Sequence, residues 1–153
     1  LETTEAEPAA RNTAAAEFRA EELLRRNHRN ARVLLVEDEP INREVLLAIL
    51  EESGVQVDTA EDGYQAIAMV TANDYQLILM DVQMPTMNGL DATRAIRQLP
   101  RGQQLAIVAL TANALSEDRD ACLGAGMNDF VTKPVASEIL FEVMLKWLRK
   151  IPL

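Results

Sequence analysis

The chain has 153 residues, of which 48% are hydrophobic and 4% aromatic, and its formal net charge at pH 7 is −9. This length accommodates one domain with an extension, and the mainly aliphatic apolar content is sufficient for a core. The acidic balance argues against nucleic-acid binding, because three lysines, Lys133, Lys146 and Lys150, make no basic stripe that could neutralise phosphates. The single cysteine, Cys122, excludes a disulfide framework and suits a reducing compartment.

The sequence has no feature of a membrane-spanning or secreted chain. No apolar run approaches the ~20 residues that cross a bilayer, and no signal peptide opens the chain. We therefore expect a cytoplasmic chain that makes no membrane contact of its own. Because it begins at Leu1 without an initiator methionine, the simplest expectation is a segment of a longer protein.

Residues 1–31 are predicted to form a linker and a connector helix. Residues 1–12 are rich in Glu, Thr and Pro without apolar periodicity, which is typical of a linker. Residues 13–27 favour a helix with a thin apolar stripe, which either docks on a neighbour or leaves the helix mostly solvated. His28 lies in a polar junction without an acid or a second histidine beside it, so we assign it no catalytic role.

From residue 32 to residue 150 the chain alternates between strand and helix patterns, which predicts one α/β domain with a doubly wound parallel sheet. Five βα units are expected, without an internal repeat. The predicted strands are 32–37, 55–60, 76–80, 105–110 and 129–132; the helices are 40–53, one around 66–70, 89 to about 99, 115–123 and 137–149. The helix over 115–123 has an Ala-rich and charged surface, so we expect it to pack least well.

Acidic residues follow two of the predicted strands. The third strand is an unbroken apolar run that ends in Asp81, and the first ends in Glu37 and Asp38. Because parallel strands end at one edge, these carboxylates are expected to converge there, and a cation would then be needed to offset their repulsion. Oxygen ligands without a nearby Cys or His favour Mg²⁺. The alternative is that these acids are merely solvated strand ends.

The fourth and fifth strands add a hydroxyl and an ammonium group to the same edge. Thr111 follows the fourth strand and Lys133 the fifth. Around a metal ion, these groups could hold the oxygens of an incoming phosphoryl group. Asp81 is the central candidate for the nucleophile, because a carboxylate can accept a phosphoryl group as an acyl phosphate. Such a role requires Asp81 to lie near Asp38 and Lys133 and to face solvent.

Four motifs, in order and at characteristic spacings, resemble the response-regulator receiver domain of two-component phosphorelays. The resemblance runs from about residue 32 to residue 148. The residues of these motifs are most similar to those of receivers fused to hybrid sensor histidine kinases. The motifs are Val36-Glu37-Asp38-Glu39-Pro40, Met80-Asp81-Val82-Gln83-Met84-Pro85 with Asn88-Gly89, Ala109-Leu110-Thr111-Ala112, and Thr132-Lys133-Pro134.

The resemblance implies a flavodoxin-like (βα)5 fold with strand order 2-1-3-4-5. It also implies that Asp81 is phosphorylated by a histidine kinase or a histidine phosphotransfer protein. Thr111 and Lys133 would bind the phosphoryl group, and the Lys133–Pro134 peptide bond would be cis. Mg²⁺ would be bound by Asp38, Asp81 and the backbone carbonyl of Gln83, with Glu37 acting partly through water.

Switching and output are also implied by the resemblance. Phe130 occupies the position of the family's aromatic switch, and it lacks the hydroxyl of the tyrosine often found there. Thr111 moving toward the new phosphoryl oxygens would make room for Phe130. The output surface would fall on residues 113–148.

Three alternatives compete with a phosphorylated receiver. A phosphatase of the haloacid dehalogenase type would need a second Asp two residues after Asp81, where this chain has Gln83. A flavodoxin-like cofactor binder would need a phosphate-cradling loop after the first strand, where Glu37-Asp38-Glu39-Pro40 would repel phosphate. A receiver-like interaction module that is never phosphorylated stays open, because only phosphorylation assays exclude it.

Overall fold

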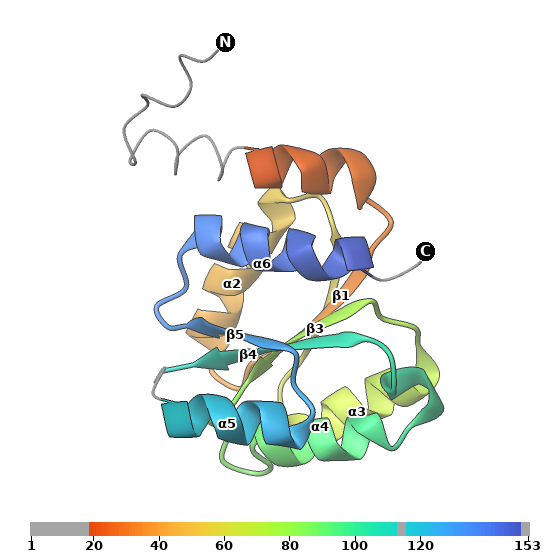
Figure 1. The fold of residues 1–153 in the computed structure, drawn as a ribbon, viewed down its shortest axis with the longest axis vertical. Coiled ribbons are helices and arrows are strands. Elements are labelled where there is room, and N and C mark those ends of the chain that lie inside the picture. The colour runs from red at the N-terminus through yellow and green to blue at the C-terminus, as the bar shows by residue number, and fades with distance from the viewer. Residues whose placement is uncertain (1–18, 113–115, 151–153) are drawn as a thin grey trace.

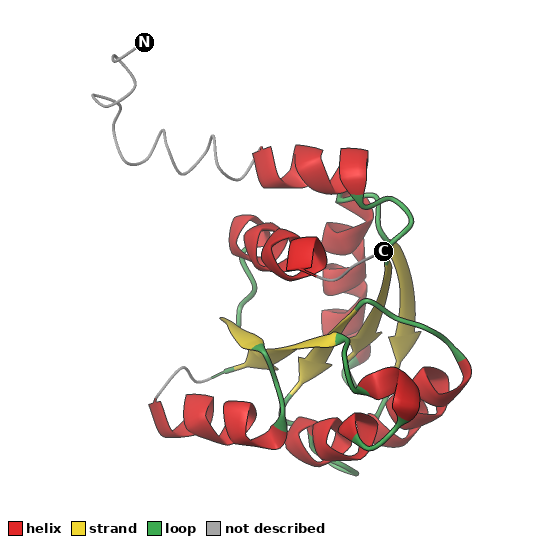
Figure 2. Ribbon diagram, turned by 45° about the vertical axis from the view of Figure 1, so that its right-hand side comes forward, coloured by secondary structure: helices red, strands yellow, loops and turns green. Residues whose placement is uncertain are grey.

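The computed structural model describes residues 19–112 and 116–150. Five parallel strands form one sheet in the order β2-β1-β3-β4-β5, with helices on both faces (Figures 1 and 2). The predicted doubly wound fold and its strand order are therefore confirmed. The elements are β1 Arg32–Val36, α2 Pro40–Glu52, β2 Gln56–Ala60, α3 Gly63–Ala72, β3 Leu77–Asp81, α4 Gly89–Arg97, η2 Pro100–Gly102, β4 Ala106–Thr111, α5 Ser116–Ala125, β5 Asp129–Thr132 and α6 Ser137–Lys150.

The central strands β3 and β4 are buried along their whole length, as their continuous apolar runs predict. In the register of this pair, Asp81 lies opposite Leu110. Asp81 is thus the last residue of β3 and not the first residue after it. The carboxyl ends of β1, β3, β4 and β5 meet at one edge of the sheet, and the predicted site residues other than Phe130 lie at these strand ends or directly after them.

Side chains cap the N-termini of α2, α3 and α4, the helices that follow β1, β2 and β3. Glu39 accepts a hydrogen bond from the amide of Asn42 at the start of α2, and Pro40 occupies the first turn. Asp62 caps α3, and Asn88 caps α4 by accepting from the amide of Asp91. Each cap fixes the residue at which the helix begins and so limits the length of the loop before it. The polar residues between strand and helix therefore lie close to the edge of the sheet.

Two apolar clusters fill the space on either side of the sheet. On one side α2 and α6 cover the alternate residues Val33, Leu35 and Leu79, and on the other α3, α4 and α5 cover Leu34, Ile78 and Met80 (Figure 1). Of the residues in α5 whose burial the structure describes, only Cys122 and Ala125 are buried. That agrees with the weak packing expected of this helix.

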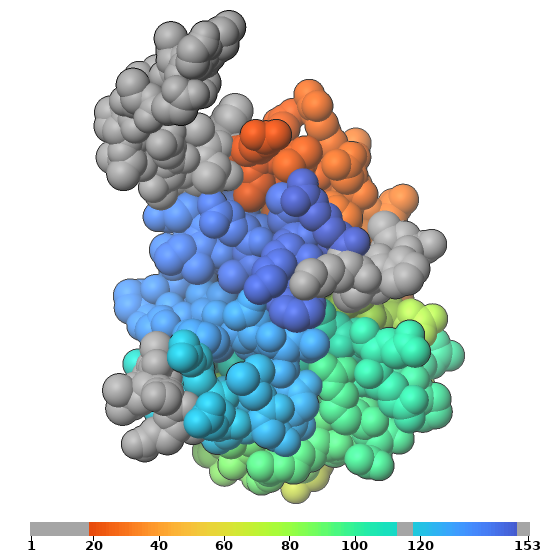
Figure 3. Space-filling view, in the orientation of Figure 1, coloured from red at the N-terminus to blue at the C-terminus, as the bar shows by residue number. Residues whose placement is uncertain are grey.

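The connector helix packs on the domain, which the sequence left open. Residues 19–27 are helical, and Ala20 and Leu24 are buried in the cluster that also holds Leu50 of α2 and Leu148 of α6. Arg25 Nε donates to the carbonyl of Glu52 at 2.7 Å, which satisfies an acceptor at the end of α2. The space-filling view shows these residues (orange) against α6 (dark blue) (Figure 3). Residues 1–18 of the predicted linker and helix lie outside the described residues.

His28, at the junction after this helix, is buried at 7% exposure although its neighbours in sequence are charged or polar. Burial, together with the charge of Arg149, lowers the pKa of His28. This position favours a neutral imidazole within the packing. No helix among the described residues is both long and apolar enough to cross a bilayer.

Candidate functional site

The backbone at the end of β3 is held close to the start of α4. The amide of Val82 donates to the carbonyl of Leu110 at 3.1 Å, and the amide of Gly89 donates to the carbonyl of Val82 at 2.9 Å. A Cβ atom at Gly89 would collide with the backbone oxygen of Asp81. Only glycine fits so close to the neighbouring chain, which gives a physical reason for Asn88-Gly89 in the motif.

Three carboxylates gather at this edge, as the sequence predicted. One oxygen from each of Glu37, Asp38 and Asp81 lies within 4.8 Å of the others. Glu37 and Asp81 are almost fully buried, at 1% and 3% exposure, and Asp38 is partly exposed. Buried like charges at this range repel strongly, so the cluster is poised for a cation.

Lys133 reaches the same cluster from the end of β5. Its Nζ lies 3.1 Å from Asp81 Oδ1 and 3.4 Å from Glu37 Oε1. The Lys133–Pro134 peptide bond that follows is cis. The ammonium group offsets part of the negative charge, and its side chain is 27% exposed. Asp81 itself is buried, so the expectation that it faces solvent is not met by its own side chain; its partly exposed neighbours Asp38 and Lys133 bring the cluster to the surface.

The charge balance of the site appears in the pKa shifts of Asp81 and Lys133. Burial, and then the charge of Glu37, raise the pKa of Asp81 to about 6, against the opposing effects of Lys133 and the amide of Gln83. Burial lowers the pKa of Lys133. The hydrogen bond and charge of Asp81, together with those of Glu37, raise it by more than burial lowers it, so the net shift is upward. The site therefore holds a firmly protonated lysine beside a carboxylate whose negative charge is incompletely compensated.

Thr111 and Phe130 lie on the neighbouring strands β4 and β5. Thr111 is the last residue of β4 and is 8% exposed; its carbonyl accepts a hydrogen bond from the amide of Lys133 at 2.7 Å, which ties the two strand ends together. Phe130 lies in β5 and packs partly buried against the cluster beneath α3, α4 and α5. The guanidinium of Arg119 stands 5.4 Å from the centre of its ring. Asn113, the first residue of the predicted output surface, lies outside the described residues.

The donor set fits a hard divalent cation such as Mg²⁺. Three carboxylates at one point supply the oxygen ligands that Mg²⁺ prefers, and among the described residues this is the only such group of His, Cys, Asp and Glu side chains. The amide of Gln83 donates to Asp81 Oδ1 at 3.2 Å, so the backbone of Gln83 lies beside the carboxylate. Coordination by the carbonyl of Gln83 stays a prediction.

One neighbour of the cluster was not singled out from the sequence. Arg43, in the first turn of α2, donates to the carbonyl of Glu37 at 2.8 Å and approaches that of Asp38 at 3.5 Å. The only sequence signal is its position one helical turn after Glu39, which turns it back toward the loop.

A groove of about 400 Å³ opens beside the acidic cluster, between α2 and the segment after β5. Glu37 and Lys133 form its charged end, and the rest is largely apolar. Ile41 and Val45 of α2 are exposed at 70% and 55% on the neighbouring surface. The apolar lining comes from Val45, Leu46, Ile49, Pro134 and Val135.

Curated relatives match the chain over its larger part. It is 42% identical over 122 residues to the sensor histidine kinase GacS of Pseudomonas protegens, covering 78% of this chain and 13% of that protein. It is 38% identical over 115 residues to the signal transduction histidine-protein kinase BarA of Escherichia coli K12, covering 75% and 12% respectively. The chain thus spans only about an eighth of the length of these relatives.

Solved structures show the same fold. The receiver domain of the sensor histidine kinase PA1611 from Pseudomonas aeruginosa PAO1, which has magnesium coordinated in its active-site cleft, is 42% identical with a TM-score of 0.74, covering 78% of this chain and 98% of that one. The receiver domain of Ssk1 from Saccharomyces cerevisiae, solved with the histidine phosphotransfer protein Ypd1, is 30% identical with a TM-score of 0.73, covering 77% and 88%. Residues 33–145 match the family described as the response regulator receiver domain, and the chain belongs to that family.

Proposed function

We propose that this receiver domain accepts a phosphoryl group on Asp81 from a phosphohistidine donor. The observation that carries the proposal is the convergence of Asp81 with Lys133 at 3.1 Å and with the carboxylates of Glu37 and Asp38. One ammonium and one cation site beside a single reactive carboxylate form a receptor for a group that brings its own negative oxygens.

In the transfer step, a carboxylate oxygen of Asp81 attacks phosphorus. A new O–P bond forms, the N–P bond of the phosphohistidine breaks, and the electron pair of that bond returns to the imidazole nitrogen of the donor. Lys133 pairs with a phosphoryl oxygen, and the Thr111 hydroxyl donates to another. The product is an acyl phosphate, which water can later hydrolyse to restore the free carboxylate.

Glu37, Asp38, Asp81 and the carbonyl of Gln83 would hold Mg²⁺ beside this reaction. When bound, the ion supplies positive charge that offsets both the acidic cluster and the phosphoryl oxygens. In this arrangement Asp38 and Glu37 act as ligands, and Lys133 is left to contact the phosphoryl group.

The partner that fits is a histidine kinase or a histidine phosphotransfer protein that presents its histidine from a helix. The groove beside Lys133 has an apolar lining with the exposed Ile41 and Val45 next to it. An amphipathic helix could lay its apolar face there while its histidine reaches the charged end. The Ssk1 receiver, which is similar to this chain, was solved with the histidine phosphotransfer signaling protein Ypd1.

Phosphorylation would act on the rest of the domain through Thr111 and Phe130. The new group adds roughly two negative charges at the sheet edge. Movement of Thr111 toward it would free space for Phe130, and the ring would then leave its contact with Arg119. The output surface would lie on α5, β5 and α6.

The relatives also suggest where this domain belongs. Because GacS and BarA are sensor kinases of which the matched region is a small part, we infer that the chain is a cytoplasmic segment of a hybrid sensor histidine kinase. In that parent, residues 32–150 would form the receiver and residues 1–31 the linker and connector.

Mass spectrometry of the intact protein tests the proposal. Incubation with Mg²⁺ and acetyl phosphate should add one phosphoryl group to the parent chain and none to Asp81→Asn. Asp74→Asn, which changes an exposed aspartate at a distance from the cluster, is the matched control and should be modified like the parent. No adduct on the parent, or an equal adduct on Asp81→Asn, would refute the proposal and favour an unphosphorylated interaction module.

A further inference from the structure

We propose that Arg43 is a positioning residue of the metal site, which holds the loop after β1 so that the carboxylates of Glu37 and Asp38 point at Asp81. Its guanidinium donates to the carbonyl of Glu37 at 2.8 Å and lies 3.5 Å from that of Asp38. The inference rests on the proposed function only in assigning the acidic cluster to a cation. Arg43 itself would touch neither the ion nor the phosphoryl group.

The choice of partners distinguishes Arg43 from an ordinary ion-pair arginine. It contacts the backbone of two of the three residues whose carboxylates form the cluster, yet among the described residues its side-chain hydrogen bonds go to backbone carbonyls and it forms no ion pair. A guanidinium paired with Glu37 or Asp38 would compete with a cation for their oxygens. Binding the carbonyls leaves those oxygens available.

Besides the contact of Lys133 Nζ with the Glu37 carboxylate at 3.4 Å, few interactions hold the loop. The amide of Glu37 donates to the carbonyl of Ala60, and the amide of Glu39 donates to the carboxylate of Glu37 at 3.3 Å. Neither contact fixes the backbone carbonyl of Glu37, which belongs to a residue that is 1% exposed. Arg43 satisfies that acceptor from a rigid helix whose start is itself fixed by Glu39. Groups that orient metal ligands in this way typically change metal affinity 10- to 100-fold when they are removed.

Electrostatics and positioning predict opposite results for the same substitution. Arg43→Met keeps the apolar stem but removes the positive charge and the donors. If the charge alone mattered, losing it beside a cation site would tighten Mg²⁺ binding. If Arg43 positions the ligands, Mg²⁺ binding should weaken by about tenfold. Arg43→Lys keeps the charge and a single donor, so it should fall between the parent and Arg43→Met.

The experiment is isothermal titration of the metal-free chain with Mg²⁺, combined with amide hydrogen exchange in the absence of the ion. Arg94→Ala is the matched control: it removes the same charge from an exposed arginine that pairs with Asp91, and Mg²⁺ affinity should stay within about twofold. In Arg43→Met, the amides of residues 37–39 should exchange faster while those of β3 are unchanged.

Unchanged or tighter Mg²⁺ binding by Arg43→Met, or unchanged exchange in residues 37–39, would overturn the inference. Arg43→Lys gives the same test if Arg43→Met does not fold. This test can be separated from the test of the proposed function. A parent chain that binds Mg²⁺ but accepts no phosphoryl group would refute phosphorylation, and the Mg²⁺ titration would still decide the role of Arg43.

Discussion

The ammonium of Lys133 lies 3.1 Å from Asp81 Oδ1, although 52 residues separate the two in sequence. The contact exists because β3 and β5 end at the same edge of a parallel sheet, with β4 between them. It holds a positive charge where a transferred phosphoryl group would bring negative oxygens. The contact with Lys133 also opposes the repulsion between the carboxylates of Asp81 and Glu37. It therefore affects both the reactivity of Asp81 and the stability of the domain.

Replacing Lys133 by alanine should slow phosphorylation of Asp81 by roughly a hundredfold, because the phosphoryl oxygens lose their protein cation. It should also raise the pKa of Asp81 further, since Lys133 is among the groups that lower it. The measurements are the rate of adduct formation with acetyl phosphate and an NMR titration of the Asp81 carboxyl carbon. Lys146→Ala, in α6, serves as the control for lost charge. A Lys133→Ala rate close to that of the parent would contradict the role given to this residue.

Without metal, Asp81→Asn should stabilise the domain above neutral pH. The pKa of Asp81 is raised from 3.8 to about 6 in the folded state, so its contribution to stability is present in full below the unfolded pKa and is lost as the pH rises through about 6. The neutral amide escapes that loss. We expect a gain of roughly 2–3 kcal/mol in the free energy of unfolding at about pH 8, shrinking toward pH 4.

Urea unfolding in EDTA at a series of pH values measures this gain. Asp74→Asn changes an exposed aspartate paired with Arg101, and its effect should be small and nearly independent of pH. An Asp81→Asn variant no more stable than the parent at pH 8 would mean that the buried charge is already compensated.

Magnesium should reverse the destabilisation by the acidic cluster. A ligand that binds only the folded state adds about 2.7 kcal/mol when it is present at about a hundred times its dissociation constant. The melting temperature of the parent should therefore rise with added Mg²⁺, and that of Asp38→Asn should rise much less, because one of the three carboxylates is gone. Differential scanning calorimetry with and without Mg²⁺ makes the comparison. Equal responses would show that the ion binds elsewhere.

The residues of the site could be predicted from the sequence better than the residues that hold the site and the connector helix in place. Asp81 could be located because an apolar run that ends in an acid marks a buried strand ending at a functional edge. Lys133 and Thr111 followed from the same periodicity, and the strand order followed from the family resemblance. Arg43 could not be found in this way, because its partners are backbone carbonyls, which have no signature in the sequence. The docking of Leu24 was undecidable from a stripe of so few apolar residues.

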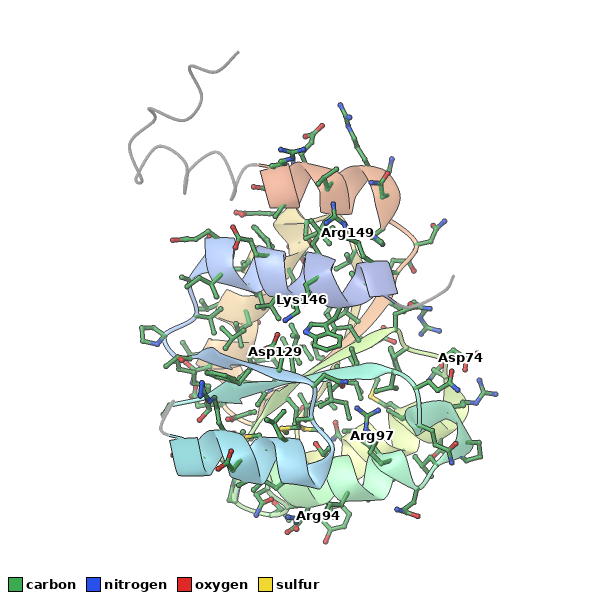
Figure 4. The ribbon with its side chains drawn as sticks, viewed as in Figure 1. Asp74, Arg94, Arg97, Asp129, Lys146 and Arg149 are labelled. Atoms are coloured by element: carbon green, nitrogen blue, oxygen red, sulfur yellow. The ribbon has the colours of Figure 1, made fainter. Side chains whose placement is uncertain are left out.

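Arg97 illustrates the same limit and yields a prediction. Its guanidinium donates to the carbonyls of Gly102, Leu105 and Gly126 and to Asn128 Oδ1, at 2.7–3.0 Å (labelled in Figure 4). Burial lowers the pKa of Arg97, and among the described residues it has no carboxylate partner. Arg97→Ala should cost roughly 2–4 kcal/mol of stability, since several acceptors lose their donor.

Chemical denaturation in EDTA checks this value, with Arg94→Ala on the same helix as the exposed control. Arg97→Lys should recover little, because one ammonium cannot replace a planar fork that serves carbonyls on two segments. Mg²⁺ affinity should be unaffected by either change, since the acidic cluster lies at the opposite end of the strands. A loss of Mg²⁺ binding in folded Arg97→Ala would contradict this separation.

The connector helix should prove part of the folding unit, although the family match begins only at residue 33. Leu24 is fully buried against the cluster shared by α2 and α6, so Leu24→Ala removes a core side chain and should cost roughly 2–4 kcal/mol in the free energy of unfolding. Arg26→Ala, two residues further along on the exposed side of the helix, where Arg26 pairs with Glu22, should cost less than about 0.5 kcal/mol. Urea unfolding of the 153-residue chain measures both. If the helix were a solvated connector, the two variants would unfold at the same midpoint as the parent; a single shifted transition for Leu24→Ala alone would instead mean that the helix and the sheet unfold together.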